Sequence, residues 1–151
     1  MSGDHYFEDF AVGQRIATRG VTVTEASIVD FGLQFDPQPF HVDADAAAAS
    51  AYGGLIASGW HTCAICMRLN CETYINRAVS LGSPGLDNIR WLKPVRPGDT
   101  ITYRRTVLES RASQRRPSVG LLRSRTEALN QAGDLVMSME GWGMFGRRPA
   151  P

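Results

Sequence analysis

One long apolar helix is the feature that most limits how this chain can fold. Between Gly59 and Ala78, apolar side chains recur at steps of three and four, which is the spacing of one helix face. Further apolar residues fall on the other face of the first half, so other elements of the same domain must cover most of it. Charged residues follow from Arg68 onward, which predicts that the second half reaches solvent.

The covering elements are predicted to be β-strands. A first strand is predicted over residues 15–24. After the long helix the pattern changes to period two, interrupted by turn signals, in the segments DNIRWLKPV, RPGDTITYRRTVLES, PSVGLLRSRTEALN and LVMSMEGWGMF. This order predicts an α+β fold in which an antiparallel sheet wraps one long helix. Residues 1–151 are expected to form a single domain, with a loose tail at about 146–151.

Short helices are predicted between the first strand and the long helix. A helix over residues 25–35 must end at Asp36, because Pro37 disfavours a helical conformation in the residue before it. Asp43 can cap a second helix through the alanine run that follows, and the pair Gly53-Gly54 ends that helix. The long helix then starts after Ser58, which suits an N-cap.

The charge balance argues against some classes of partner. The chain has 16 Lys and Arg residues against 15 Asp and Glu residues, so neither nucleic acid nor an anionic membrane is expected as a partner. The basic stretch YRR, residues 103–105, is interpreted as part of a solvated strand edge. The first ten residues lack the basic start of a signal peptide and no membrane-spanning run follows, so a cytoplasmic protein is expected.

The cysteines do not indicate a metal site. Cys63, Cys66 and Cys71 all fall in the long helix, and no second Cys/His cluster is present to complete a zinc site. The first two have the spacing of a redox pair, but no predicted strand precedes them as in redox folds. We expect reduced packing residues and no bound metal.

The stretch FDPQPFH, residues 35–41, is the first candidate for a functional site. Its two prolines fix two φ angles, so the segment up to Phe40 is expected to be stiff and mostly extended. Asp36 and His41 can meet only if the chain turns near Phe40, because a five-residue step does not place them on one face of an extended chain. If they meet, they suit general acid and base catalysis on one water molecule. The alternative is a proline-rich helix breaker without a catalytic role.

Gly59 is the second candidate, because it begins the long helix. Unpaired backbone N–H groups and the positive end of the helix dipole at this point can stabilise an oxyanion. A glycine would let a substrate carbonyl come close to the backbone. An ordinary helix start with Ser58 as cap explains the same letters. The nearby His61 is interpreted as a surface or core histidine.

Three segments together resemble one known family. FDPQPFHVD, GGLIASGW and IRWLKPVRPGDTI are similar, in order and spacing, to motifs of the MaoC-like (R)-specific enoyl-CoA hydratases. That family has an Asp-x-Asn-Pro-x-His-x-Asp stretch, a His-Gly pair at the start of a central helix, and a later strand reading Phe-x-x-Pro-Val-x-x-Gly-Asp. The resemblance implies a hot-dog fold and a homodimer or larger homo-oligomer.

The resemblance also implies an activity and the residues for it. The family's catalytic acid falls on Asp36, its histidine on His41, and the glycine whose N–H receives the thioester oxygen on Gly59. These residues would add water to a trans-2-enoyl-CoA thioester and give (R)-3-hydroxyacyl-CoA, with coenzyme A as part of the substrate and no separate cofactor. Further contacts to the acyl-CoA substrate are expected from Gln38, Ser58 and Trp60.

The chain departs from the family pattern at three positions. Gln38 stands where the family has Asn, Ser58 replaces the histidine before the helix glycine, and Met67 occupies a position where some members have a serine. These departures leave a non-catalytic acyl-CoA binding module open as an alternative. A hot-dog acyl-CoA thioesterase is another, because the same oxyanion site and acid can serve attack of water at the carbonyl. Met67 and Trp91 could line the acyl pocket, but core packing is the preferred interpretation for both. Arg90, Lys93 and Arg96 could contact CoA phosphates, and a solvated strand end explains these three residues equally well.

Overall fold

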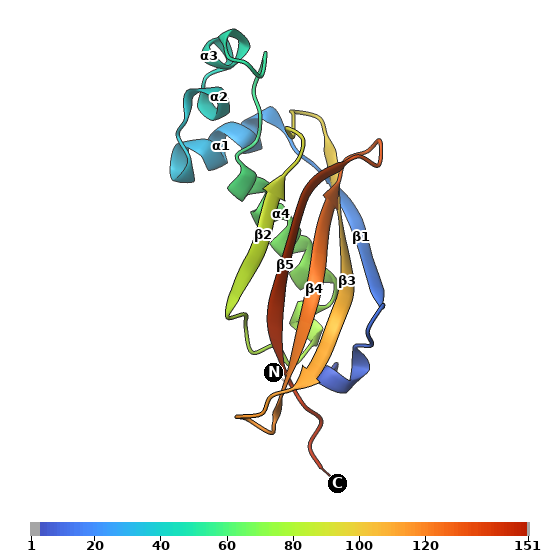
Figure 1. Cartoon of the computed structure of the whole chain (residues 1–151). Helices are drawn as coiled ribbons and strands as arrows, with labels where there is room; N and C mark the ends of the chain where they lie inside the picture. Colours follow the sequence, from blue (N-terminus) through green and yellow to red (C-terminus); the bar gives the residue numbers. More distant parts are fainter. Residues whose placement is uncertain (1–3, 151) are drawn as a thin grey trace.

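A five-stranded antiparallel sheet and one long helix form the body of the protein (Figure 1). A computed structural model describes residues 4–150. The strands lie in the order β1-β3-β4-β5-β2, and all neighbouring pairs are antiparallel. Their bounds are Arg15–Thr22 for β1, Gly85–Trp91 for β2, Thr100–Ala112 for β3, Val119–Leu129 for β4 and Leu135–Gly146 for β5.

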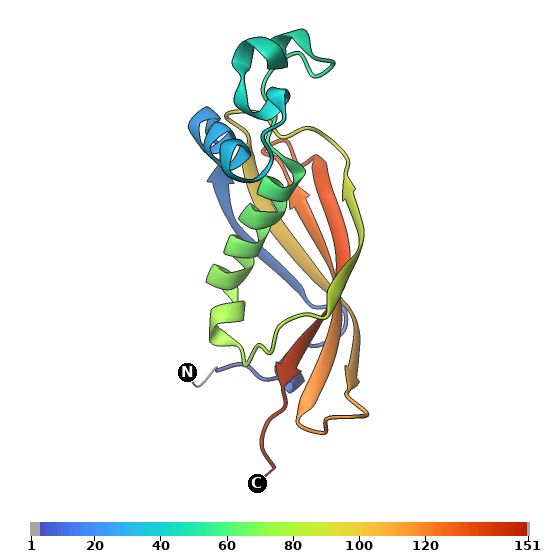
Figure 2. The ribbon, with the colours of Figure 1, turned by 90° about the vertical axis from the view of Figure 1, so that its left-hand side faces the viewer.

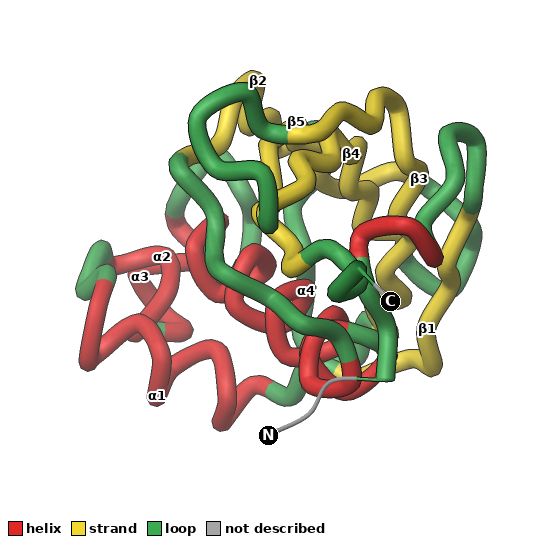
Figure 3. The backbone as a smooth tube through the Cα atoms, turned by 90° about the horizontal axis from the view of Figure 1, so that it is seen from below, coloured by secondary structure: helices red, strands yellow, loops and turns green. Residues whose placement is uncertain are grey.

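The helix α4, Gly59–Thr73, packs against the inner face of this sheet. Figure 2 shows it running along the strands, and Figure 3, a view from below, shows the strands curving around one side of it. Burial alternates along β3 and β4, because successive strand residues point to opposite faces. The inward residues pack with α4 in a core that includes Ile65, Cys66, Leu69, Ile101 and Met137. The predicted α+β hot-dog arrangement is therefore confirmed.

The long helix is shorter than predicted, and only one of its faces is buried. It ends at Thr73, and after the irregular residue Tyr74 a separate 3-10 helix, η2, covers Ile75–Arg77. The helical spacing predicts core positions for Trp60 and Met67, but these residues are 56% and 52% exposed. Apolar residues on a helix need not all face the core of their own chain.

Three short helices gather at the end of the sheet where α4 begins (Figures 1 and 2). They are α1, Glu25–Phe35, α2, Pro39–Val42, and α3, Ala44–Ala49. The prediction of an extended segment up to Phe40 was wrong, because Pro39 is the first residue of α2. Proline suits this position, since its φ angle is already helical and the first turn does not need its missing N–H. The chain therefore turns one residue earlier than expected.

The cysteines form no disulfide within the described residues, and the C-terminal segment is partly fixed by ion pairs. All three cysteines are free, and burial raises the pKa of Cys66 to about 12, so this thiol stays protonated. Part of the expected loose tail is held, since Arg147 and Arg148 form ion pairs with Glu8 and Asp9. The last residue of that tail, 151, lies outside the described residues.

No helix within residues 4–150 combines the length and apolar character needed to cross a bilayer. The same residues hold no group of three or more His, Cys, Asp or Glu side chains placed to bind a metal ion.

Candidate active site

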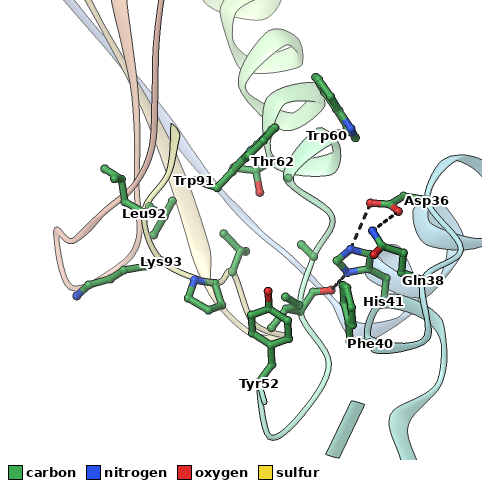
Figure 4. A pocket seen from close by; sticks show the side chains of 16 residues that line it. Asp36, Gln38, Phe40, His41, Tyr52, Trp60, Thr62, Trp91, Leu92 and Lys93 are labelled. Atoms are coloured by element: carbon green, nitrogen blue, oxygen red, sulfur yellow. Dashed lines mark hydrogen bonds and ion pairs between the residues drawn. The ribbon is translucent and has the colours of Figure 1, made fainter. Parts of the chain in front are cut away.

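Asp36 and His41 lie side by side, on the turn that joins α1 to α2. Asp36 is the C-cap of α1, and its backbone N–H donates to the carbonyl of Gly32 at 2.9 Å. His41 lies in α2 and is 4% exposed. His41 Nε2 is 3.3 Å from Asp36 Oδ2 (Figure 4). The chain turns between the two residues, as the sequence requires if their side chains are to meet.

A backbone carbonyl fixes which nitrogen of His41 faces Asp36. Nδ1 is 2.6 Å from the carbonyl oxygen of Ile56 (Figure 4). A carbonyl can only accept a hydrogen bond, so Nδ1 carries the proton. In the neutral ring, Nε2 is then an acceptor that points at the carboxylate.

Two donors hold the Asp36 carboxylate. Gln38 Nε2 donates to Oδ1 at 2.8 Å, and the Ser58 hydroxyl donates to Oδ2 at 2.7 Å. Burial opposes ionisation of Asp36, but the hydrogen bonds from Gln38 and Ser58 and the nearby His41 outweigh it, and the pKa of Asp36 lies below its usual value. Asp36 is therefore a carboxylate at neutral pH.

Ser58 links this carboxylate to the start of α4. Its Oγ accepts a hydrogen bond from the backbone N–H of Trp60 at 3.2 Å, as the predicted N-cap, while it donates to Asp36. Its side chain is 1% exposed. Ser58 thus lies behind Asp36 and orients it, and it is not among the residues that line the cavity described next.

A cavity of about 430 Å³ opens in front of the pair. Figure 4 shows Asp36, Gln38 and His41 on one side of it and Trp91, Leu92 and Lys93, which lie at the end of β2 and just beyond it, on the other. The N-terminus of α4, at Gly59 and Trp60, also lines it, as do Tyr52 and Phe40. The three residues expected to be catalytic, Asp36, His41 and Gly59, therefore border one space.

Trp91 explains part of the need for a glycine at position 59. A Cβ atom on Gly59 would overlap the Trp91 indole ring. The same ring meets Trp60 edge to face, with ring centroids 5.3 Å apart. The first turn of α4 is therefore in close contact with an aromatic ring, and only a residue without a side chain allows this contact.

The three basic residues suggested for CoA phosphates separate in the structure. Lys93 lines the cavity and also forms an ion pair with Asp134 at 2.9 Å. Arg96 donates to the carbonyl of Tyr52 at 2.6 Å and does not line the cavity. Arg90 does not line it either.

Sequence reasoning did not assign a site role to two nearby groups. The Ile56 carbonyl gives no signal in the sequence, because every residue has one. His61 is buried, stacks on Phe31 at 4.7 Å, and its Nδ1 has no hydrogen-bond partner within residues 4–150. Burial lowers the pKa of His61, and His41, when protonated, lowers it further, so the His61 ring is neutral at pH 7.

Comparison with known proteins connects this geometry to one family. The profile of the MaoC like domain matches residues 9–128. The chain is 30% identical to the uncharacterized protein YdeM of Bacillus subtilis, over 82% of this chain and 86% of that protein. It is 32% identical to a protein of Rhodospirillum rubrum named (R)-specific enoyl-CoA hydratase, over 71% of this chain and 75% of that protein.

A solved structure shares both the fold and a good part of the sequence. It is the crystal structure of a MaoC-like dehydratase from Rhodospirillum rubrum, with a TM-score of 0.89 and 39% sequence identity, and the match covers 97% of this chain and 99% of that one. Other relatives are longer, since this chain spans 30% of the length of Protein MaoC of Klebsiella aerogenes.

Proposed function

The chain belongs to the MaoC-like domain family, and we propose that it is a hydro-lyase that hydrates trans-2-enoyl-CoA thioesters to (R)-3-hydroxyacyl-CoA. The observation that carries this proposal is the Asp36 and His41 pair, 3.3 Å apart at the edge of a cavity that also contains the start of α4. The name of the Rhodospirillum rubrum relative, (R)-specific enoyl-CoA hydratase, supports the same reaction and stereochemistry.

Asp36 and His41 together orient the attacking water. Asp36 is ionised. The Ile56 carbonyl holds a proton on Nδ1 of His41, so in the neutral form of the ring Nε2 is an acceptor. A water that donates one O–H to each of these acceptors keeps its lone pairs free to attack.

The reaction then moves one proton from water to the substrate. As the water oxygen bonds to the β-carbon, one O–H bond breaks and its proton passes to Asp36. The electron pair of the double bond shifts toward the thioester and forms an enolate. The proton returns by way of His41 to the α-carbon, which completes the hydration and restores both side chains. The same steps in reverse dehydrate the product.

The N-terminus of α4 stabilises the enolate in this proposal. The Gly59 N–H lies in the first turn of a 15-residue helix, where backbone donors lack partners inside the helix and the dipole is positive. An oxyanion placed there would gain more from these groups than the neutral carbonyl does, which lowers the barrier. No cofactor other than the CoA of the substrate is needed.

A direct assay tests the proposal. Purified protein is mixed with enoyl-CoA thioesters of several chain lengths, and the loss of enoyl absorbance is followed. Asp36→Asn and His41→Ala are each expected to lower kcat by about 10²- to 10⁴-fold, because each removes a proton-transfer group. Asp30→Asn is the matched control, since Asp30 lies on the same helix and its carboxylate accepts a hydrogen bond from Gln34 Nε2 at 3.2 Å.

Three outcomes would contradict the proposal. The parent protein could be inert at every chain length, or Asp36→Asn could react as fast as the parent. Release of free CoA thiol without hydroxyacyl-CoA would instead identify a thioesterase, which the same helix N-terminus and acid could serve.

We also propose that the working form is at least a dimer. Trp60, Met67, Leu86 and Trp91 are large apolar side chains that are each at least 46% exposed, and they all line one of the cavities bordered by α4. A second copy of the chain could cover them. A monomeric mass at micromolar concentration in sedimentation experiments would contradict this.

A further inference from the structure

A second cavity, of about 460 Å³, lies between α4 and the inner face of the sheet. Its lining extends from Trp60, in the first turn of α4, to Tyr74, immediately after its last turn. The 15 residues of α4 span about 22 Å, and Figure 2 shows this helix lying along the strands. Trp60 also lines the cavity of Asp36 and His41, so the two cavities are neighbours. Most of the wall is apolar, and the volume is in the range of ligand pockets.

A buried arginine lies at the far end of this second cavity. Arg105 on β3 lines the cavity and is 3% exposed. Its guanidinium carbon lies 4.5 Å from the centre of the Tyr74 ring, which places it at the end of α4 opposite to Asp36. Its Nε–H donates to Ser124 Oγ at 2.9 Å. Nη1 is buried and has no hydrogen-bond partner among residues 4–150.

No acid in the described chain neutralises Arg105. None of the ion pairs within residues 4–150 includes it. Glu140 lines the same cavity, but Arg123 and Arg125 bind its two carboxylate oxygens at 2.7 and 3.0 Å. Burial raises the pKa of both Tyr74 and Tyr103, so these phenols stay neutral beside the guanidinium.

Burying such a charge without a counter-charge is unfavourable. The penalty for an uncompensated buried ion is several kcal/mol. The faces of Tyr74, Phe10 and Phe145, whose ring centres lie 4.5 to 5.9 Å from the guanidinium carbon, recover part of it by cation–π attraction. They leave the positive charge in place and cannot accept the Nη1 hydrogen bond in the plane of the guanidinium group. The site therefore has room for an anionic acceptor.

We propose that the counter-charge arrives with the substrate, as a carboxylate at the far end of a long acyl chain. This rests on the proposed function, which places the thioester carbonyl at Gly59. The chain would pass Trp60, lie in the apolar cavity beside α4, and present its terminal carboxylate to Arg105. Arginine binds a carboxylate through two parallel hydrogen bonds, and the low polarity around it strengthens both. An unsubstituted chain of equal length would leave the guanidinium buried against a methyl group, so the site discriminates against it.

The test compares two substrates that differ only at the far end. These are trans-2-hexadecenoyl-CoA and the same thioester with a carboxylate in place of its terminal methyl group. The parent protein is expected to prefer the carboxylated substrate in kcat/KM by about tenfold or more, the effect of hydrogen bonds to a charged group. Arg105→Met, which keeps a long side chain and removes the charge, is expected to abolish the preference by lowering kcat/KM for the carboxylated substrate.

Arg104→Met is the matched control. Arg104 is the neighbouring residue on β3, and its Nε–H donates to Glu127 at 3.0 Å on the other face of the sheet. This variant should keep the preference for the carboxylated substrate. The midpoint of thermal unfolding is measured for both variants, and if Arg105→Met does not fold, Arg105→Lys takes its place. Lysine keeps the charge but not the paired hydrogen bonds, so an intermediate preference is expected.

Further measurements separate this inference from the proposed function. trans-2-Butenoyl-CoA is too short to reach Arg105, so its hydration tests the reaction alone. If it reacts and the parent shows no preference between the two long substrates, the inference is wrong and the proposed function stands. If no enoyl-CoA reacts, calorimetry with the saturated carboxylated and unsubstituted acyl-CoA decides the inference. Tighter binding of the carboxylated ligand by the parent, lost in Arg105→Met, would support it, and equal binding would overturn it.

Discussion

The charged groups near the two ends of α4 differ in their hydrogen-bond partners. At the first end, the Asp36 carboxylate accepts hydrogen bonds from Gln38 and Ser58 and faces His41. At the far end, the Arg105 guanidinium has one hydrogen bond to a neutral hydroxyl, three aromatic rings around it and no acid within the described chain. The first charge is held by groups of the protein, and the second lacks a counterpart.

This difference separates a group prepared for chemistry from a group prepared for binding. A catalytic base must have its orientation and pKa set before the substrate arrives, so its partners belong to the protein. A residue that recognises a charged substrate gains most when its last hydrogen bond is left for the ligand, because a ligand without that group then leaves it unpaired. Three substitutions near the N-terminus of α4 test how strongly the surrounding residues determine the geometry and the pKa values there.

Gly59→Ala is expected to have the largest effect of the three. The added Cβ would overlap the Trp91 indole ring, so either Trp91 or the first turn of α4 must move. Overpacking of this kind lowers the free energy of unfolding by about 1–3 kcal/mol, and the displaced N–H is expected to lower kcat as well. Both quantities are measured, by denaturant unfolding and by enoyl-CoA hydration.

A second substitution shows whether Trp91 is the cause. In the double variant Gly59→Ala with Trp91→Ala, the clash is gone, and stability should return toward that of Trp91→Ala alone. If Gly59→Ala is as stable and as active as the parent, the contact with Trp91 does not explain the glycine.

Ser58→Ala is expected to have a smaller effect on stability and a specific effect on pH dependence. Loss of the N-cap lowers the free energy of unfolding by about 1 kcal/mol. Asp36 also loses the donor to Oδ2, so its pKa rises from its lowered value, and the acid side of the pH profile of kcat/KM moves to higher pH.

Thr24→Ala is the matched control for the cap. Thr24 Oγ1 accepts from the backbone N–H of Ser27 at the start of α1, and no hydrogen bond joins it to Asp36. It should lower stability by a similar amount and leave the pH profile unchanged. Equal pH profiles for Ser58→Ala and the parent would show that Ser58 does not tune Asp36.

The sequence predicts the first end of α4 better than the far end, and the reason is the range of the interactions. Proline, glycine and cap residues act on their immediate neighbours, so the end of α1 at Asp36 and the start of α4 at Gly59 could be predicted. The meeting of Asp36 with His41 depends on a turn at Pro39 that was expected later in the chain. The Ile56 carbonyl that fixes the His41 ring has no sequence signal.

Arg105 was misinterpreted for a related reason. The stretch YRR was expected to lie on a solvated strand edge, but β3 lies between β1 and β4. Alternation along the strand leaves Arg104 partly exposed and turns Arg105 into the core. Period-two alternation shows which residues share a face, whereas the choice of the face that is buried depends on how β3 pairs and packs against α4. Two adjacent arginines therefore have opposite environments, which charge patterns alone do not reveal.

His61→Phe is expected to have the smallest effect, and it tests a buried ring nitrogen near the first end of α4 that has no hydrogen-bond partner within residues 4–150. The pKa of His61 is lowered by burial and by nearby His41, so the unfolded chain binds a proton at a higher pH than the folded protein does. The contribution of His61 to the free energy of unfolding is therefore fully present above about pH 6.5, the pKa in the unfolded chain. It declines as the pH falls below that value. Asp36 affects stability over a lower pH range. Because its pKa is lowered in the folded protein, the stability that its carboxylate contributes is lost only as the pH falls below about 3.9, the unfolded pKa.

The measurement is the midpoint of thermal unfolding between about pH 7 and pH 5. Phenylalanine can keep the stacking on Phe31 and does not titrate, so the variant should lose less stability than the parent as the pH falls. Asp36→Asn, measured over the same range, should follow the parent, because Asp36 remains ionised there in the folded protein. An identical decline in the parent and in His61→Phe would mean that His61 accepts its proton without opposing the fold.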